Sequence, residues 1–243
     1  MKITIFNGSP RAENGNTHVM VEAFMKGAVQ AGAEVENVFL LKKEINHCRG
    51  CFSCWLKTPG ECVIKDDMAE LLEKFVNSDI VVFATPLYID NVTGIMKNFM
   101  DRIIPVADPH FGKDKGGECV HVARFEKIPK LVIISSCGFP EQSHFQVLEL
   151  LFKRISRNMR TEVVGEIYRG AGSVLKEVPF ILKPIIHRYK KLLQKAGREI
   201  VENQRLSAET KTKLEKPLIS EERYIAAANE HFDKMLSTNA GTS

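Results

Sequence analysis

Residues 2–32 read KITIFNGSPRAENGNTHVMVEAFMKGAVQAG, and this stretch indicates the fold class of the whole chain. Its first six residues form a short apolar run that ends at Gly8-Ser9-Pro10, which is typical of a strand buried on both faces. The apolar residues that follow recur at helical spacing, and Gly32 ends that helix. They are Val21, Phe24, Met25, Ala28 and Val29. A buried strand that leads directly into an amphipathic helix predicts a parallel α/β sheet.

The same alternation of strand and helix continues to about residue 170. Four further apolar runs predict strands at Val35–Leu40, Asp79–Thr85, Lys130–Ser136 and Thr161–Ile167. Amphipathic stretches predict helices between them at 67–76, 95–104 and about 143–157. We therefore expect a five-stranded, doubly wound parallel sheet with right-handed crossovers and helices on both faces.

Two segments lie outside this alternation. Residues 105–129 form a long connection, in which Glu118–Phe125 predicts the arm of a hairpin. After Gly170 the chain turns to helix alone. We therefore expect one domain over residues 1–170 and a helical extension over residues 171–243.

The extension carries a continuous apolar stripe at helical spacing, formed by Ile185, Tyr189, Leu192, Leu193, Ala196 and Ile200. Because two helical layers already cover a sheet of this kind, we expect the stripe to bury itself against a second copy of the chain. This predicts a homodimer or homotetramer, with Leu192, Leu193 and Ile200 in or near the interface.

The composition is that of an ordinary soluble globular protein. Of the 243 residues, 44% are hydrophobic and 26% are charged, which excludes disorder, collagen and a coiled coil. No apolar run approaches the ~20 residues of a membrane span, and the first apolar stretch is too short for a signal peptide. We therefore expect a cytoplasmic protein without a membrane partner.

The net charge of +4 is concentrated in one segment. Residues 169–205 hold nine Lys or Arg against three Asp or Glu, a local charge of +6, which leaves the rest of the chain at −2. An excess confined to one segment is not a general signature of nucleic-acid binding, so we expect no nucleic-acid partner. The solvated face of a packed helix explains the excess, and a membrane surface or an acidic partner is the alternative.

The loop between the first strand and the first helix has the composition of a phosphate site. Ligands of an open parallel sheet bind outside the carboxyl ends of its strands. A phosphate here would meet free backbone N–H groups and the positive end of the helix dipole. The side chains that could add donors are Ser9, Arg11, Asn16 and Thr17. The loop matches neither Gly-x-Gly-x-x-Gly nor a Walker A motif, and a polar turn taken alone is more often structural.

Four motifs extend this interpretation: Gly8-Ser-Pro-Arg with Asn16-Thr17, then Asp66-Asp-Met, Thr85-Pro-Leu-Tyr and Met96-Lys-Asn-Phe-Met-Asp-Arg102. Over roughly residues 1–168 the chain thereby resembles the flavodoxin-like, NAD(P)H-dependent FMN reductases. The resemblance implies a flavodoxin-like fold and bound FMN, with the phosphate in the first loop. It places along the flavin ring Pro86, Leu87, Tyr88, Ile89, Asn91, Cys137 and Gly138. For Leu87, Tyr88 and Ile89 ordinary core packing is the alternative.

Four of the six cysteines fall within fifteen residues, separated by two, two and seven residues: Cys48, Cys51, Cys54 and Cys62. In a reducing compartment such a cluster indicates metal or redox chemistry before disulfides. Successive two-residue gaps wrap one loop around three irons of a cubane cluster, and a turn at Pro59-Gly60 delivers the last cysteine to the fourth. The loop 48–62 resembles that of the iron–sulfur flavoproteins, a branch carrying FMN and a 4Fe–4S cluster. A zinc tetrathiolate and free thiols are the alternatives.

The resemblance implies an FMN-dependent oxidoreductase that accepts hydride from NAD(P)H and passes electrons to a small-molecule or protein acceptor through the cluster. Hydride transfer to flavin needs no acid or base from the protein, so no side chain is expected to be catalytic. The acceptor stays open among quinones, nitro compounds, free flavin and a protein. The alternatives are an electron carrier that exchanges electrons with ferredoxin, without NAD(P)H turnover, and a non-redox scaffold with structural zinc.

Overall fold

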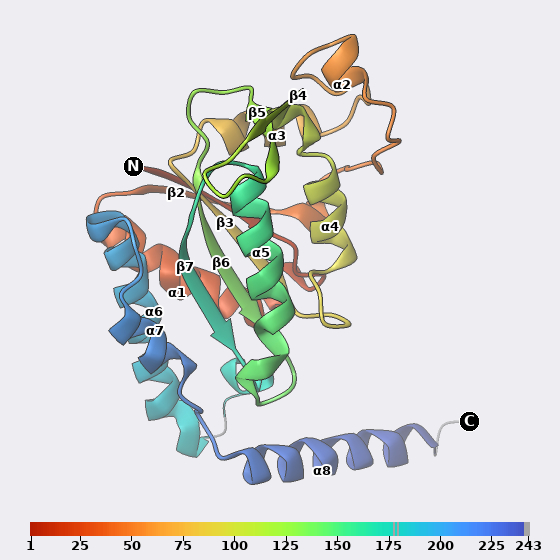
Figure 1. The fold of residues 1–243 in the computed structure, drawn as a ribbon. Helices are drawn as coiled ribbons and strands as arrows, with labels where there is room; N and C mark the ends of the chain where they lie inside the picture. Colours follow the sequence, from red (N-terminus) through yellow and green to blue (C-terminus); the bar gives the residue numbers. More distant parts are fainter. Residues whose placement is uncertain (177, 179, 241–243) are drawn as a thin grey trace.

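A computed structural model describes residues 1–176, 178 and 180–240. The centre of this part of the chain is a five-stranded parallel sheet (Figure 1). Its strands are β1 (Lys2–Asn7), β2 (Glu34–Phe39), β3 (Ile80–Pro86), β6 (Lys130–Ser136) and β7 (Val163–Arg169). They lie in the order β2-β1-β3-β6-β7, so the chain winds outward from β1 in both directions. The expected flavodoxin-like α/β fold is confirmed.

Helices cover both faces because the strand side chains alternate between two hydrophobic cores. In β3, Ile80 and Val82 pack into one core, whereas Val81 and Phe83 pack into the other. The first core is closed by α1 (Asn16–Gln30), α6 (Lys183–Asn203) and α7 (Ala208–Glu215). The second is closed by α3 (Met68–Val76), α4 (Gly94–Asp101) and α5 (Gln146–Asn158).

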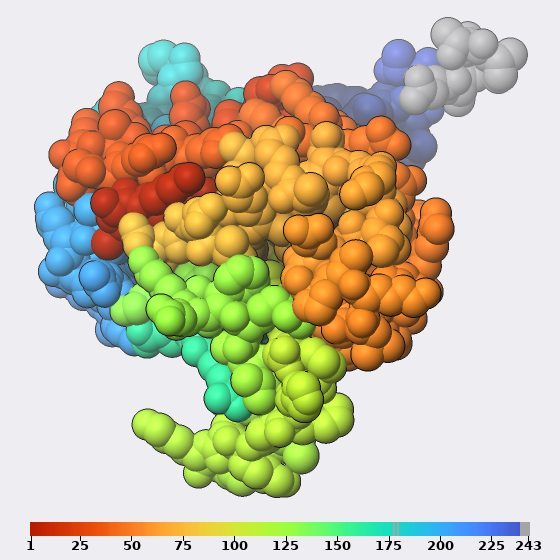
Figure 2. All heavy atoms as spheres, turned by 90° about the horizontal axis from the view of Figure 1, so that it is seen from above, coloured from red at the N-terminus to blue at the C-terminus, as the bar shows by residue number. Residues whose placement is uncertain are grey.

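The long connection forms an antiparallel hairpin from β4 (Ala107–Lys113) and β5 (Cys119–Ala123). This confirms the hairpin arm expected there. The hairpin packs beside the cysteine loop, since the ring centroids of Trp55 and His121 are 4.9 Å apart. In the space-filling view its yellow-green tip projects from the body of the molecule, next to the orange cysteine segment (Figure 2).

The apolar stripe of α6 lies inside the chain and not at a subunit interface. Leu193 and Ile200 are fully buried in the core that α1 closes, and Leu192 is partly buried against the same core. The prediction that these residues form an interface is therefore wrong. Helix α6 is the second helix on its face of the sheet, so it completes that layer instead of adding a further one.

Two glycines let α1 and α6 approach closely. A Cβ atom on Gly27 would lie 1.8 Å from the carbonyl oxygen of Gln194. A Cβ atom on Gly197 would lie 2.1 Å from the carbonyl oxygen of Phe24. The helices therefore pack backbone against backbone, which only glycine permits at these two positions.

The last helix, α8 (Glu221–Ala240), leaves the body of the molecule below the carboxyl ends of the strands (Figure 1). Its large apolar side chains are exposed: Ile225, Phe232, Met235 and Leu236. Its first turn is anchored by Tyr224, whose hydroxyl donates to the carbonyl oxygen of Gly138 at 2.6 Å. Among the described helices, α8 included, none is long and apolar enough to cross a membrane. Among the helices that the structure describes after residue 170, α8 is therefore the one whose large apolar side chains stay outside the core.

Candidate functional site

Hydrogen bonds around Ser9 shape the loop between β1 and α1. Ser9 is 2% exposed, and its backbone N–H donates to Asn7 Oδ1 at 3.1 Å. Its hydroxyl accepts the backbone N–H of Arg11 at 3.3 Å. A Cβ atom on Gly15, which caps α1, would lie 2.3 Å from that hydroxyl, so the loop closes tightly at this point. The Arg11 side chain is exposed, and Asn16 begins α1.

Ser136 ties three strand-end loops together. Its hydroxyl lies 2.9 Å from Thr17 Oγ1 at the start of α1. Its carbonyl oxygen accepts the backbone N–H of Leu87 at 2.9 Å. Both Thr17 and Ser136 are buried. The structure therefore brings the predicted phosphate loop, the loop after β3 and the loop after β6 to one place, through a residue that sequence reasoning missed.

Thr93 is a second residue that sequence reasoning missed. Its hydroxyl donates to the carbonyl oxygen of Gly8 at 2.7 Å and accepts the backbone N–H of Met96 at 3.2 Å. It thereby caps α4 and fastens the start of this helix to the first loop. The signal was present in the sequence, since a threonine directly before an amphipathic stretch favours a helix start.

The loop that follows Pro86 presents apolar side chains to solvent. Tyr88 is 49% exposed and Ile89 is 97% exposed, which excludes core packing for both. Tyr88 and Asn91 exchange backbone hydrogen bonds across a tight turn, and Leu87 is partly buried. Water contacts the large apolar surface of this turn, and a flat ring laid against it would remove that surface from water.

The loop after β6 carries Cys137 and Gly138. Burial raises the pKa of the Cys137 thiol to about 11, and its Sγ donates to the carbonyl oxygen of Phe139 at 3.2 Å. The thiol therefore stays neutral and is not a nucleophile. Gly138 is exposed, and Tyr224 of α8 binds its carbonyl oxygen. Sequence analysis did not connect the C-terminal helix to this loop.

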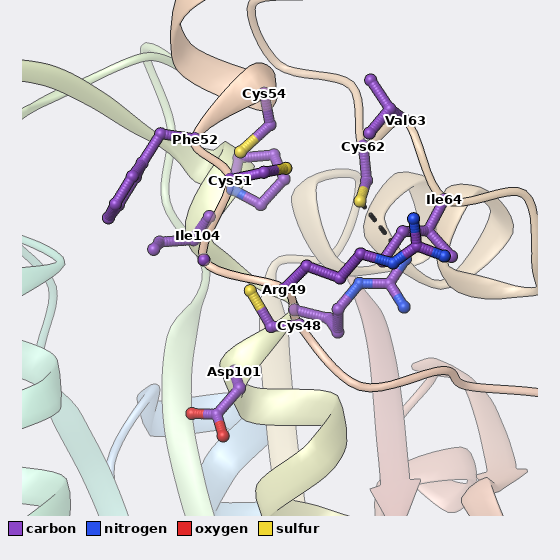
Figure 3. Close-up of a pocket in the computed structure, with 13 residues that line it drawn as sticks. Cys48, Arg49, Cys51, Phe52, Cys54, Cys62, Val63, Ile64, Asp101 and Ile104 are labelled. Carbon is purple, nitrogen blue, oxygen red and sulfur yellow. Dashed lines mark hydrogen bonds between the residues drawn. The ribbon is translucent and has the colours of Figure 1, made fainter.

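The four clustered cysteines line one pocket at the other end of the molecule (Figure 3). Cys54 lies on α2 (Ser53–Leu56), and the other three lie on the irregular segments around that short helix. Figure 3 shows the four sulfur atoms arranged around a shared space. The same pocket is lined by the apolar Ile104 and Pro105 and by the side chain of Arg102.

The thiols are near enough to influence each other's ionisation. Burial raises the pKa of Cys54, and the neighbouring sulfurs of Cys62, Cys51 and Cys48 raise it further. A hydrogen bond with Ser53 lowers the pKa of Cys51. Mutual repulsion of this kind disappears when thiolates share a cationic centre, so the donor set fits a cluster of iron or a zinc ion. Within the described residues, however, no three His, Cys, Asp or Glu side chains form a metal-coordinating group.

The two sites lie at opposite ends of α4. The helix begins beside the first loop, where Thr93 binds Gly8, and ends at Asp101, which lines the cysteine pocket. Eight helical residues span about 12 Å. The cysteine pocket therefore lies toward the amino ends of the strands, away from the strand-end loops.

The fold defines a flavodoxin-like α/β protein. Residues 1–123, just over half of the chain, match the family described as NADPH-dependent FMN reductase. The chain belongs to this family of oxidoreductases.

Curated relatives support the iron–sulfur flavoprotein branch. The chain is 43% identical over 142 residues to an iron-sulfur flavoprotein of Archaeoglobus fulgidus, covering 58% of each protein. It is 36% identical over 122 residues to an iron-sulfur flavoprotein of Methanocaldococcus jannaschii, covering 50% of this chain and 62% of that one. The chain thus spans about three fifths of the length of these relatives. The resemblance expected from the motifs is confirmed.

Solved structures share the fold. An FMN-dependent NADH-azoreductase from Bacillus anthracis, determined with FMN, has a TM-score of 0.60 at 15% identity and covers 83% of this chain and 99% of its own. An NAD(P)H:quinone oxidoreductase from Methanothermobacter marburgensis has a TM-score of 0.56 at 16% identity, with coverages of 82% and 96%. At these identities the likeness concerns the fold alone.

Proposed function

We propose that this protein is an FMN-dependent oxidoreductase that takes hydride from NAD(P)H and passes electrons, through a four-iron cluster, to a small-molecule or protein acceptor. One observation carries the proposal: a chain of the FMN reductase family sets four cysteines around a single pocket. Hydride transfer to flavin alone needs no such pocket, whereas relaying single electrons does.

The FMN phosphate would lie in the first loop. Ser9, Asn16 and Thr17 stand there at the start of α1, whose first backbone N–H groups lack intrahelical acceptors. The exposed guanidinium of Arg11 is free to turn onto the phosphate. A dianion at this place meets hydroxyl, amide and charged donors together with the helix dipole.

The flavin ring would lie between the loop after β3 and the loop after β6. Exposed Tyr88 and Ile89 supply an apolar surface, with Leu87 and Asn91 in the same loop and Pro86 at the end of β3. Cys137 and Gly138 form the opposite edge, where a neutral thiol adds no charge. Bound FMN supplies the redox chemistry, and these residues hold the ring, orient it and exclude water from it.

The cluster would be held by the sulfur atoms of Cys48, Cys51, Cys54 and Cys62. It would supply one-electron chemistry at the far end of α4 from the flavin. Apolar Ile104 and Pro105 would border it on one side, whereas the exposed Cys48 and Cys51 leave the other side open to solvent.

Anaerobic purification tests both cofactors at once. We expect a yellow-brown protein with a flavin band, a broad shoulder to its red, and about four irons and four sulfides per chain. NADH or NADPH should bleach the flavin band rapidly. A colourless preparation would refute the flavin proposal, and zinc in place of iron would identify a structural site.

An electron carrier without NAD(P)H turnover is the second candidate. It is favoured by the position of the cysteine loop, which lies at the surface beside the projecting hairpin and is therefore accessible to a protein donor (Figure 2). Fast flavin reduction by ferredoxin, with negligible reduction by either nucleotide, would decide for the carrier. Fast reduction by a nucleotide would decide against it.

A further inference from the structure

Arg102 is a buried cation beside the cysteine pocket. It caps the carboxyl end of α4 and is 1% exposed, although arginines are almost never fully buried unless paired. Its Nη2 donates to Cys62 Sγ at 3.4 Å, the contact marked by the dashed line in Figure 3. Its Nη1 donates to the carbonyl oxygen of Asn46, two residues before Cys48. One guanidinium thus contacts the cysteine loop at both of its ends.

Asp66 fixes the orientation of this guanidinium. Its two carboxylate oxygens accept from Arg102 Nη1 at 2.7 Å and from Nη2 at 3.0 Å, a bidentate arrangement that lysine could not make. Asp66 is held in turn by the backbone N–H groups of Asn46 at 2.9 Å and Met68 at 3.1 Å. The backbone on both sides of the cysteine loop therefore determines where the Nη2–H bond points.

We propose that Arg102, oriented by Asp66, is the positioning residue for Cys62: it closes the cysteine loop and holds the fourth thiolate at the cluster. The inference rests on the proposed four-iron cluster and goes beyond it, because it assigns a role to a residue that is not a ligand. Around metal sites, residues that are not ligands commonly orient the ligands through hydrogen bonds, and carboxylates are frequent among these residues.

Cys62 needs such support more than the other three cysteines do. Cys48, Cys51 and Cys54 follow each other at two-residue gaps, so one short loop brings them together. Cys62 comes after a seven-residue gap and lies in a segment that the structure describes as neither helix nor strand. The turn before it is tied to α2 by the backbone N–H of Gly60, which donates to the carbonyl oxygen of Cys54 at 2.9 Å. Arg102 supplies the described hydrogen bond to the Cys62 sulfur itself.

The Nη2–H donor would also affect the reduction potential of the cluster. A hydrogen bond to a ligand sulfur stabilises the state with more negative charge, which is the reduced cluster. Because Asp66 neutralises the net charge of Arg102, the local N–H bond and not a long-range field carries this effect.

The test compares cluster composition in variants purified anaerobically. Arg102→Gln should carry about three irons per chain in place of about four, with the paramagnetic resonance signal of an oxidised three-iron cluster. Cys62→Ser provides the reference spectrum for a lost fourth ligand. Any four-iron fraction left in Arg102→Gln should have a lower reduction potential than the wild type. Asp66→Asn should show the same loss of iron more weakly. Its remaining four-iron fraction should instead have a higher potential than the wild type, because the charge of Arg102 is then no longer neutralised.

Lys57→Gln is the matched control. Lys57 is an exposed cation of the same loop, but it does not line the cysteine pocket and the described contacts give its side chain no hydrogen bond. This variant should keep the iron content and the potential of the wild type. Flavin binding at the far end of α4 reports whether each variant is folded. If Arg102→Gln does not fold, Arg102→Lys, which keeps the charge and loses the bidentate geometry, decides by the same readouts.

A folded Arg102→Gln protein with four irons and the wild-type potential would overturn this inference and leave the cluster proposal intact. The same result for Arg102→Lys, where Arg102→Gln does not fold, has the same meaning. A wild-type protein that holds zinc or no metal after anaerobic purification would overturn both.

Discussion

Arg11 reaches solvent from the first loop, and its side chain is the strongest candidate for a charged bond to the FMN phosphate. Hydrogen bonds to a charged group contribute about 1.5–3 kcal/mol. Arg11→Ala should therefore weaken FMN binding by about tenfold to a hundredfold without unfolding the chain. A flavin titration measures the change. Arg49→Ala, at the far end of α4, should leave the affinity unaltered, and an equal affinity in both variants would remove Arg11 from the site.

Cys51 provides a separate test of the cluster at the same scale. Cys51→Ser removes one of the four thiolates, and we expect the iron–sulfur absorbance to be lost while FMN stays bound. The reason is the separation of the two sites along α4. Iron analysis and flavin fluorescence of one anaerobic preparation measure both. Loss of flavin together with iron would show that the sites are not independent.

Asp66 makes stability depend on pH in acid. Burial alone would raise its pKa, but hydrogen bonds from Arg102 and from the backbone lower it from 3.8 to about 2. The folded chain therefore binds fewer protons than the unfolded chain in this range. Stability from the lowered pKa is present above about pH 4 and is lost as the pH falls toward 2, amounting to about 2 kcal/mol.

Acid unfolding of an iron-free Cys51→Ser background measures this loss without interference from the cluster. Adding Asp66→Asn to that background should lower the free energy of unfolding near pH 7 and flatten its decrease between pH 4 and 2. Parallel curves for the two proteins would contradict the assignment to Asp66.

At the scale of elements, α1 and α6 cross with their backbones in contact at Gly27 and Gly197. Alanine normally favours a helix over glycine by about 1 kcal/mol. At Gly197 the added methyl group would meet the carbonyl oxygen of Phe24, so Gly197→Ala should instead destabilise the chain by about 1–3 kcal/mol. Gly94→Ala on α4 meets no atom within 4 Å and serves as the control. Chemical denaturation of both variants checks the sign, and a stabilised Gly197→Ala would refute the close contact.

The sheet and its helices up to residue 170 could be predicted from sequence. Hydrophobic periodicity and turn residues are local features, so each element can be recognised from its own residues. The place of α6 could not be predicted. An apolar stripe shows that a helix is buried but not which surface covers it. The pair that decides the covering surface is Gly27 and Gly197, where the two backbones meet. Glycines facing each other from two amphipathic helices would have favoured packing within the chain.

In the candidate sites, too, local features could be predicted from sequence and long-range contacts could not. The loop residues Ser9 and Thr17 and the cysteines were recognisable from their spacing. The contact of Arg102 with Cys62 joins residues 40 positions apart, and that of Tyr224 with Gly138 joins residues 86 apart. Neither leaves a periodic or local signal, so only the folded chain reveals them.

At the scale of the whole molecule, the proposal of a homodimer or homotetramer now rests on α8. Ile225, Phe232 and Leu236 recur on one side of this helix, and all three are exposed. We expect light scattering at micromolar concentration to give a mass well above 27.4 kDa. Phe232→Glu should lower it toward that value, whereas Glu230→Gln, at a solvated position, should not. A wild-type mass near 27.4 kDa would refute the assembly.

The hydrogen bond from Tyr224 to Gly138 would couple flavin binding to the association of the chains. The first turn of α8 holds the backbone of a loop that would border the flavin, so a ligand that moves Gly138 also moves the helix. Linkage is reciprocal: if flavin binding changes the tendency of the chains to associate, association changes the affinity for flavin by the same factor. Apparent flavin affinity should then vary with protein concentration in the wild type, and Tyr224→Phe should uncouple the two equilibria.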